Sequence, residues 1–183
     1  MQLVNKVYMI TFTGDDSNPF IQYDMNTHID WVLVSECLNG ARSMSEYTPI
    51  EIVVKHKDAN KCDFYGCSGS YGLLSKKAID LLGDGAVENY QTLPAKLNGE
   101  DFSLLYCKKE TDCFDRQNSK YVEFDEPSKF LLSIEKYAFY PDRIDANCIF
   151  SIPESNRMFC SQVLASTIEN QLQGFRLIEL FSV

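Results

Sequence analysis

Two histidines and seven cysteines are the side chains in this sequence whose types could support nucleophilic chemistry. A histidine beside a cysteine can remove the thiol proton and activate the sulfur as a nucleophile. However, nothing in the sequence places a cysteine at a strand-to-helix turn beside an oxyanion donor, and no G-x-S-x-G motif occurs. We therefore interpret His28 and His56 as exposed imidazoles, and we predict no catalytic residues.

A second possibility is a metal site. His56, Cys62 and Cys67 form the pattern H-x5-C-x4-C, and zinc accepts such ligands. A fourth ligand could come from Asp63 or from a cysteine farther along the chain. Zinc knuckles usually have the spacing C-x2-C, which this pattern does not match. We therefore predict neither a metal site nor a cofactor, although the sequence leaves metal binding by the cysteines and histidines open.

Two other segments have the composition of ligand-binding loops. Residues 83–88, GDGAVE, are as glycine-rich as a phosphate loop. Phosphate loops precede a helix so that its N-terminus faces the anion, whereas this segment follows a predicted helix and is better explained as its end. Asp15, Asp16 and Asn18 could offer oxygens to calcium, but the final glutamate of a calcium loop is missing, so we interpret them as a turn.

The chain is acidic, with a formal net charge of −9 over 183 residues. Residues 1–72 and residues 98–145 each carry −4. This balance argues against nucleic-acid binding, which needs a basic surface to displace counterions. It is compatible with a basic protein partner. The alternative is that the acidity only keeps the protein in solution.

Residues 108–127 form the polar centre of the chain, where acidic side chains alternate with four lysines or arginines. Loops between strands often carry binding residues. We therefore predict that this segment contacts a partner through its carboxylates. The predicted partner-binding residues are Glu110, Asp112, Asp115, Glu123, Asp125 and Glu126. The alternative is a solvated loop that contacts nothing.

Hydrophobic patterning predicts more strands than helices. Runs of β-branched and aromatic residues predict strands at residues 7–12, 50–56, 102–107, 130–140, 148–152, 158–160 and 175–181, and residues 87–93 are predicted as an extended segment. Small side chains at residues 66–72 predict a loop, and residues 20–49 give a mixed pattern. Two short helices are predicted, at about residues 75–82, with Ser75 as the cap, and at about residues 162–173.

The second predicted helix has well-defined ends. Ser161 stands at the N-cap position, where a hydroxyl can accept a hydrogen bond from a free backbone N–H. Leu164, Ile168 and Leu172 recur every four residues, and we expect them to pack inward with Val163 beside them. Gly174 is expected to end the helix in the left-handed conformation that glycine allows.

These elements predict an α+β fold with a largely antiparallel sheet. We expect a single domain over residues 1–183, with the alternative of an N-terminal lobe over residues 1–60 beside an α+β part over residues 61–183. No run of about 18 apolar residues is present, so no membrane span is expected. The N-terminal residues lack a cleavable signal pattern, which makes the cytoplasm the expected compartment.

Two blocks of the sequence resemble a known family. They comprise residues 74–82 with Glu88 and residues 93–97, then residues 149–153, 158–161, 168–169 and 173–180. Together these blocks resemble the polymorphic-toxin immunity domain of the myxobacterial type, immunity family eleven, over roughly residues 60–181. The chain departs from the family pattern at Ser151, where arginine is common.

The resemblance implies a bacterial, non-enzymatic protein that binds and neutralises a cognate toxin. It implies no catalytic residues, because the family has none established. Two other classes remain open from the sequence. One is an unrecognised enzyme or small-ligand domain, which would need a deep pocket with convergent polar groups. The other is a scaffold that joins proteins without inhibiting them. The sequence leaves the toxin and the oligomeric state open.

Overall fold

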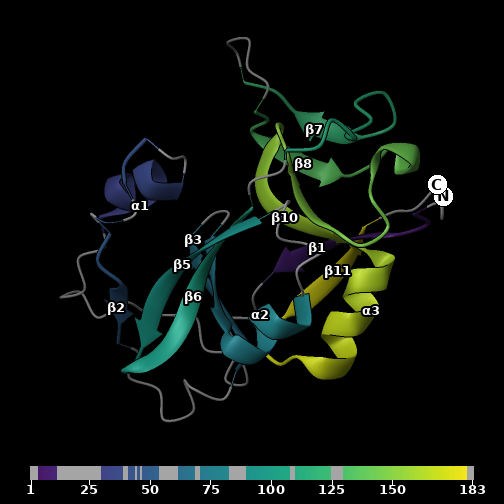
Figure 1. Ribbon diagram of the computed structural model, residues 1–183. Helices are drawn as coiled ribbons and strands as arrows, with labels where there is room; N and C mark the ends of the chain where they lie inside the picture. Colours follow the sequence, from purple (N-terminus) through teal and green to yellow (C-terminus); the bar gives the residue numbers. More distant parts are fainter. Residues whose placement is uncertain are drawn as a thin grey trace.

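The computed structural model describes residues 4–11, 30–38, 41–43, 45, 47–53, 62–68, 71–82, 90–107, 110–124 and 130–180. Within these residues, strands dominate and helices are short, which confirms the predicted α+β fold (Figure 1). The helices are α1 (Trp31–Leu38), α2 (Lys76–Leu82) and α3 (Gln162–Gln171), and a 3-10 turn, η4, spans Pro141–Arg143.

A four-stranded antiparallel sheet contains strands from both ends of the chain. Its order is β11 (Arg176–Leu180), β1 (Val7–Thr11), β10 (Ser155–Ser161) and β9 (Ile149–Ile152). Val7 pairs with Ser161 on one side and with Leu180 on the other. The first strand therefore lies in the middle of a sheet whose other members all follow residue 148.

A five-stranded sheet contains the central part of the chain. Its order is β2 (Ile50–Ile52), β5 (Tyr90–Leu97), β6 (Glu100–Cys107), β4 (Tyr71–Ser75) and β3 (Phe64–Ser68). Only the β2–β5 pair is parallel. The hairpin between β5 and β6 turns at Asn98 and Gly99, which have φ values of 50° and 81°. Asn-Gly favours this turn because both residues tolerate positive φ.

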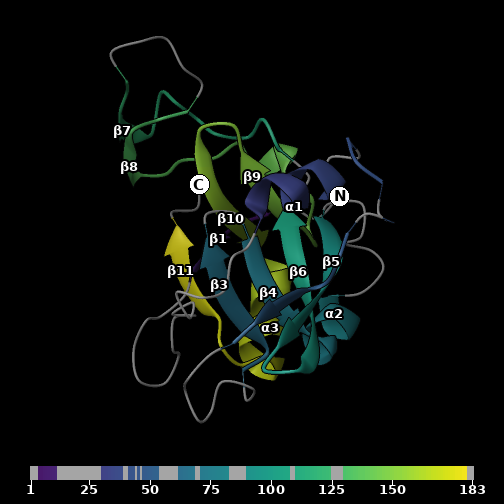
Figure 2. The same ribbon diagram turned by 90° about the vertical axis from the view of Figure 1, so that its left-hand side faces the viewer.

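A third, two-stranded ribbon projects from this body (Figures 1 and 2). It consists of β7 (Lys120–Val122) and β8 (Ser133–Lys136) and is called the β7–β8 ribbon below. We predicted one long strand over residues 130–140, and this is wrong. β8 is four residues long, and farther on Phe139 forms only an isolated bridge with Phe114.

Three apolar clusters hold these layers together. One lies between the two sheets and helices α2 and α3, and a second packs α1 on the other side of the five-stranded sheet. The third packs residues of the 110–150 region against the outer face of the four-stranded sheet. Strand β10 serves two clusters, because Met158 and Cys160 face the first and Phe159 faces the third.

Helix α3 follows the predicted register on its buried face. Leu164 and Ile168 are buried within the first cluster, as expected. Each such side chain stabilises the fold by about 1.5–3 kcal/mol through the loss of apolar surface from water. Val163 was expected beside them, but it is 46% exposed, so that expectation is wrong. One position along a helix turns a side chain by about 100°, far enough to leave the buried stripe.

Ser161 occupies the N-cap position, but its hydroxyl does not cap α3, contrary to our prediction. The Oγ atom donates instead to the carbonyl of Ala146 at 2.7 Å and accepts from the N–H of Cys148 at 3.4 Å. The hydroxyl therefore ties the start of α3 to the approach to β9. A hydrogen bond to the distant Ala146 has replaced the expected hydrogen bond to the backbone of the helix itself.

Helix α2 is capped as predicted, and its cap belongs to a partly buried polar junction. Ser75 Oγ accepts from the N–H of Ala78 at 3.1 Å and donates to Asp63 Oδ1 at 2.8 Å. The other oxygen of Asp63 accepts from the N–H of Gln173 at 3.0 Å and from Lys77 at 3.2 Å. Asp63 therefore joins the start of β3, the cap of α2 and the turn after α3.

Two other segments differ from expectation. Residues 66–72 were predicted as a loop, yet residues 66–68 and 71–72 belong to strands β3 and β4. Helix α1 was not predicted from its mixed sequence. Its start signal is Asp30, whose Oδ1 accepts from the N–H groups of Val32 and Leu33 at 3.1 and 3.0 Å.

Candidate functional site

The predicted acidic segment is not a free loop over the part that the structure describes. Residues 110–124 contain β7 and two isolated bridges, Glu110 with Ser151 and Phe114 with Phe139. Cys113 and Phe114 are buried in the third apolar cluster. The first part of the segment is therefore anchored to the four-stranded sheet, through the Glu110 bridge and the buried side chains of Cys113 and Phe114. Asp125 and Glu126 lie outside the described residues.

Asp115 is the buried member of the predicted set, only 7% exposed. Its carboxylate accepts from the side chain of Asn118 at 2.6 Å and from the N–H groups of Gln117 and Asn118 at 3.0 and 3.2 Å. The Asn118 side chain contributes most to lowering the pKa of Asp115, and these two N–H groups add to it. Asp115 therefore shapes the turn and offers little surface to a partner.

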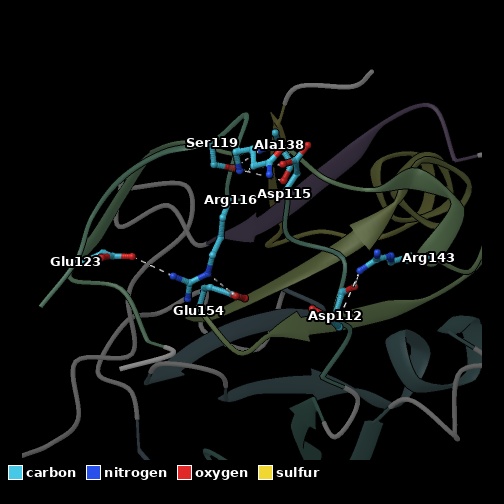
Figure 3. Close-up of polar contacts among 9 residues, drawn as sticks. Asp112, Asp115, Arg116, Ser119, Glu123, Ala138, Arg143 and Glu154 are labelled. Carbon is cyan, nitrogen blue, oxygen red and sulfur yellow. Dashed lines mark hydrogen bonds and ion pairs between the residues drawn. The ribbon is translucent and has the colours of Figure 1, made fainter. Parts of the chain in front are cut away.

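This turn is also tied to the chain beside it. The N–H of Asp115 donates to the carbonyl of Ala138 at 2.9 Å, and the N–H of Ala138 donates to Ser119 Oγ at 2.9 Å (Figure 3). The β7–β8 ribbon consequently starts from a fixed base. A fixed base reduces the entropy that a binding surface loses when a partner docks.

Arg116 joins two carboxylates that belong to different elements. Its Nη1 lies 3.1 Å from Glu123, which directly follows β7, and its Nε lies 3.3 Å from the buried Glu154 after β9 (Figure 3). The guanidinium also lies over the ring of Tyr121, 5.7 Å from its centroid. Arg116 thus holds the ribbon against the β9–β10 hairpin, and it partly offsets the charge of Glu123.

Asp112 is highly exposed, with 92% of its side chain accessible to solvent. Arg143 Nη1 donates to the Asp112 carbonyl at 2.9 Å and approaches its carboxylate at 3.4 Å (Figure 3). The same guanidinium lies over the ring of Tyr140 at 4.4 Å. Exposed pairs of this kind stabilise a fold by less than about 1 kcal/mol, so Asp112 remains able to contact a partner.

Glu110 lies on the rim of a surface hollow of about 330 Å³. The hollow is lined by Tyr106, Cys107, Glu110, Phe130, Ser151, Ile152, Pro153, Ser155 and Asn156. These residues come from the end of β6, the start of the acidic segment, the chain just before β8 and the β9–β10 hairpin. Sequence reasoning selected Glu110 but missed its neighbours, because they are distant in the chain.

Tyr106, which lines this hollow, has a pKa above its ordinary value. Burial raises the pKa of Tyr106, and the nearby Tyr71 and Glu110 raise it further. Tyr106 also stacks on Tyr71, with ring centroids 5.4 Å apart. The phenol is therefore held neutral, in a fixed position, beside a carboxylate.

Four large apolar side chains are exposed in the β7–β8 ribbon or close to it in the sequence. They are Val122, Phe124, Phe130 and Leu132. The N–H of Leu132 donates to the carbonyl of Val122 at 3.0 Å, which brings the outgoing and returning chains together. We name these four residues the apolar tip. Exposed apolar groups that gather with a polar rim are typical of interaction surfaces.

The other chemical candidates are only partly described. His28, His56, Asp15, Asp16, Asn18, residues 83–89 and the side chain of Cys67 lie outside the described residues. Within the described part of the chain, no group of three or more His, Cys, Asp or Glu side chains could hold a metal ion. Asp63, named as a fourth zinc ligand, is instead bonded to Ser75, Lys77 and Gln173.

Six of the cysteines are described, and all six are buried. Cys148 and Cys160 lie within apolar clusters, as the apolar, strand-like runs around them in the sequence predict. Burial raises the pKa of the Cys113 thiol to about 12 and raises that of Cys160 as well. Thiols held in the neutral form are poor nucleophiles and poor metal ligands.

No helix among the described residues has the length and apolar character needed to cross a membrane. No protein-family model matches the chain, and no curated protein matches it significantly in sequence.

Proposed function

We propose that this protein is a non-enzymatic immunity-type inhibitor, which binds a cognate toxin in the bacterial cytoplasm and neutralises it. The observation that carries the proposal is the exposed apolar tip beside the anchored acidic segment. Residues 110–124 hold four carboxylates against two basic side chains, a net charge of −2. An apolar centre with a charged rim is the usual composition of a protein–protein interface.

The toxin that fits this surface is a basic protein domain with an apolar contact area. The net charge of −9 attracts a basic partner and accelerates its encounter. Aromatic side chains such as Phe124 and Phe130 supply much of the binding energy in interfaces of this kind. The resemblance to the immunity domain supports the same class of partner.

The test is binding to the product of the neighbouring toxin gene, with protection of cells that express it. Replacing Phe124 and Leu132 by serine should weaken binding at least about tenfold, because both are exposed on the apolar tip. Val163→Ser is the matched control. Val163 is 46% exposed but lies on α3, away from the ribbon (Figures 1 and 2).

Three results would contradict the proposal. One is failure of the protein to bind the toxin. Another is equal weakening by the tip and control variants. The third is binding without protection, which would favour a scaffold that joins proteins without inhibiting either.

A further inference from the structure

The hollow beside Glu110 has walls of two chemical kinds. Glu110 provides an exposed carboxylate, and Tyr106 and Phe130 provide aromatic surface. Asn156 and Ser155 add neutral polar groups on the hairpin side. A carboxylate near aromatic rings recognises cations, because the carboxylate bonds the charged N–H groups while a ring face attracts the positive charge.

The position of Glu110 is fixed by the sheet beneath it. Glu110 bridges to Ser151, and the N–H of the next residue, Thr111, donates to the Ser151 carbonyl at 2.8 Å. Ser151 itself is buried on the edge strand β9. Tyr106 is also held in place, because it lies within β6 and stacks on Tyr71. A site built on strands keeps its shape before the ligand arrives.

The size of the hollow admits a single side chain as the ligand. Its volume of about 330 Å³ exceeds that of a single amino-acid side chain and is at the lower end of the range for pockets that bind small molecules. A planar guanidinium suits the walls better than an ammonium, since it can stack on an aromatic ring and bond a carboxylate through two N–H groups.

We infer that this hollow is a binding site for a guanidinium group, presented as an arginine side chain by the protein partner. This inference rests on the proposed function for the source of the arginine. Phe130 connects the two surfaces, because it belongs to the apolar tip and also lines the hollow. The arginine would therefore dock beside the apolar contact, within one interface.

The hollow is tested separately from the toxin with a small probe. The ¹⁵N-labelled full chain is titrated with N-acetyl-arginine amide and followed by heteronuclear NMR. Signals of Tyr106, Ser151 and Asn156 should shift and saturate. N-acetyl-citrulline amide has nearly the same shape without the charge, and it should bind at least about fivefold more weakly.

Two variants test which carboxylate binds the charged group of the probe. Glu110→Gln keeps the side-chain size and should weaken binding of the arginine probe at least about fivefold. Asp112→Asn removes a carboxylate two residues away, outside the lining of the hollow, and should leave binding unchanged. Equal binding of the citrulline probe, equal effects of the two variants, or shifts confined to other parts of the chain would overturn the inference.

Failure of this inference is distinguishable from failure of the proposed function. If the toxin binds but the arginine probe does not, the hollow has no guanidinium site and the inhibitor proposal stands. If the probe saturates the hollow but the protein binds no toxin, the inhibitor proposal fails. The site would then take a free guanidinium compound, and the assignment of its ligand to a partner protein would be overturned.

Discussion

Gly174 and Gly99 have similar backbone conformations but different surroundings. Their φ values are 95° and 81°, both in the region that favours glycine. A Cβ atom on Gly174 would overlap the Phe64 carbonyl oxygen and lie 3.0 Å from Cys62 Cβ. A Cβ atom on Gly99 would meet nothing within 4 Å.

Replacing each glycine by alanine separates backbone strain from steric overlap. Gly99→Ala should cost about 1 kcal/mol, from the left-handed conformation alone. Gly174→Ala should cost about 2–4 kcal/mol, because it adds overlap with the backbone of β3. Urea unfolding measures both values. Equal costs would mean that the turn after α3 can move away from β3 freely.

Asp115 makes stability depend on acid pH. The pKa of this aspartate is lowered in the folded protein from its ordinary value of 3.8, chiefly by the side chain of Asn118. The unfolded chain therefore binds the proton first as the pH falls. The stabilisation that Asp115 gives is present above the unfolded pKa of 3.8 and is lost as the pH falls through the lower, folded pKa.

Asp115→Asn should therefore be less stable than the parent at about pH 7, and the difference should shrink below about pH 4. Asp112→Asn is the control, since Asp112 forms only an exposed pair with Arg143. Urea unfolding midpoints, measured from about pH 7 to about pH 3, give both curves. A difference that does not change with pH would show that the Asp115 charge is unimportant for the turn.

At the scale of elements, helix α3 packs into the apolar cluster that lies between the two sheets. Leu164 is 2% exposed within the cluster between the sheets, and its neighbour Val163 is 46% exposed. The same substitution at these adjacent positions therefore tests the orientation of the helix. Both residues lie in its first turn, so helix propensity affects them alike.

Leu164→Asp should unfold the domain, because an unpaired charge would be buried at a cost above about 4 kcal/mol. Val163→Asp should change stability by no more than about 1 kcal/mol, since its side chain stays in water. Near-ultraviolet circular dichroism and urea unfolding report both outcomes. Cooperative unfolding of Leu164→Asp at the parent's midpoint would mean that this face of α3 is not in the core.

At the scale of the whole molecule, the acidic charge affects association more than folding. The net charge is −9, and most exposed ion pairs contribute little to stability. Long-range attraction to a basic toxin is screened by salt, because the Debye length shortens as ionic strength rises. Contacts at the apolar tip are short-range and depend less on salt.

The rate of association with the toxin should therefore fall at least about tenfold between about 20 and about 200 mM salt. The dissociation rate should change by less than about threefold, since it depends mainly on contacts at the interface. Stopped-flow measurements at several salt concentrations separate the two rates. An association rate that is independent of salt would exclude steering by the acidic surface.

The sequence by itself determined features that depend on neighbouring residues. The spacing of Leu164 and Ile168 predicts the buried face of α3, and Ser75 predicts the start of α2. The apolar surroundings of Cys148 and Cys160 predict their burial. Asn98-Gly99 also carries a strong hairpin signal that our prediction did not use. These features follow from side-chain periodicity and turn chemistry, which act over a few residues.

Tertiary structure alone decided which distant segments meet. β1 lies between β10 and β11, and no local pattern specifies that pairing. Ser161 bonds Ala146 in preference to its own helix, because the fold brings a carbonyl within 2.7 Å. The acidic segment was visible in the sequence, but the burial of Asp115 and the hollow beside Glu110 were not. A site assembled from β6, the start of the acidic segment, the chain before β8 and the β9–β10 hairpin exists only after the chain has folded, because long-range contacts place its walls.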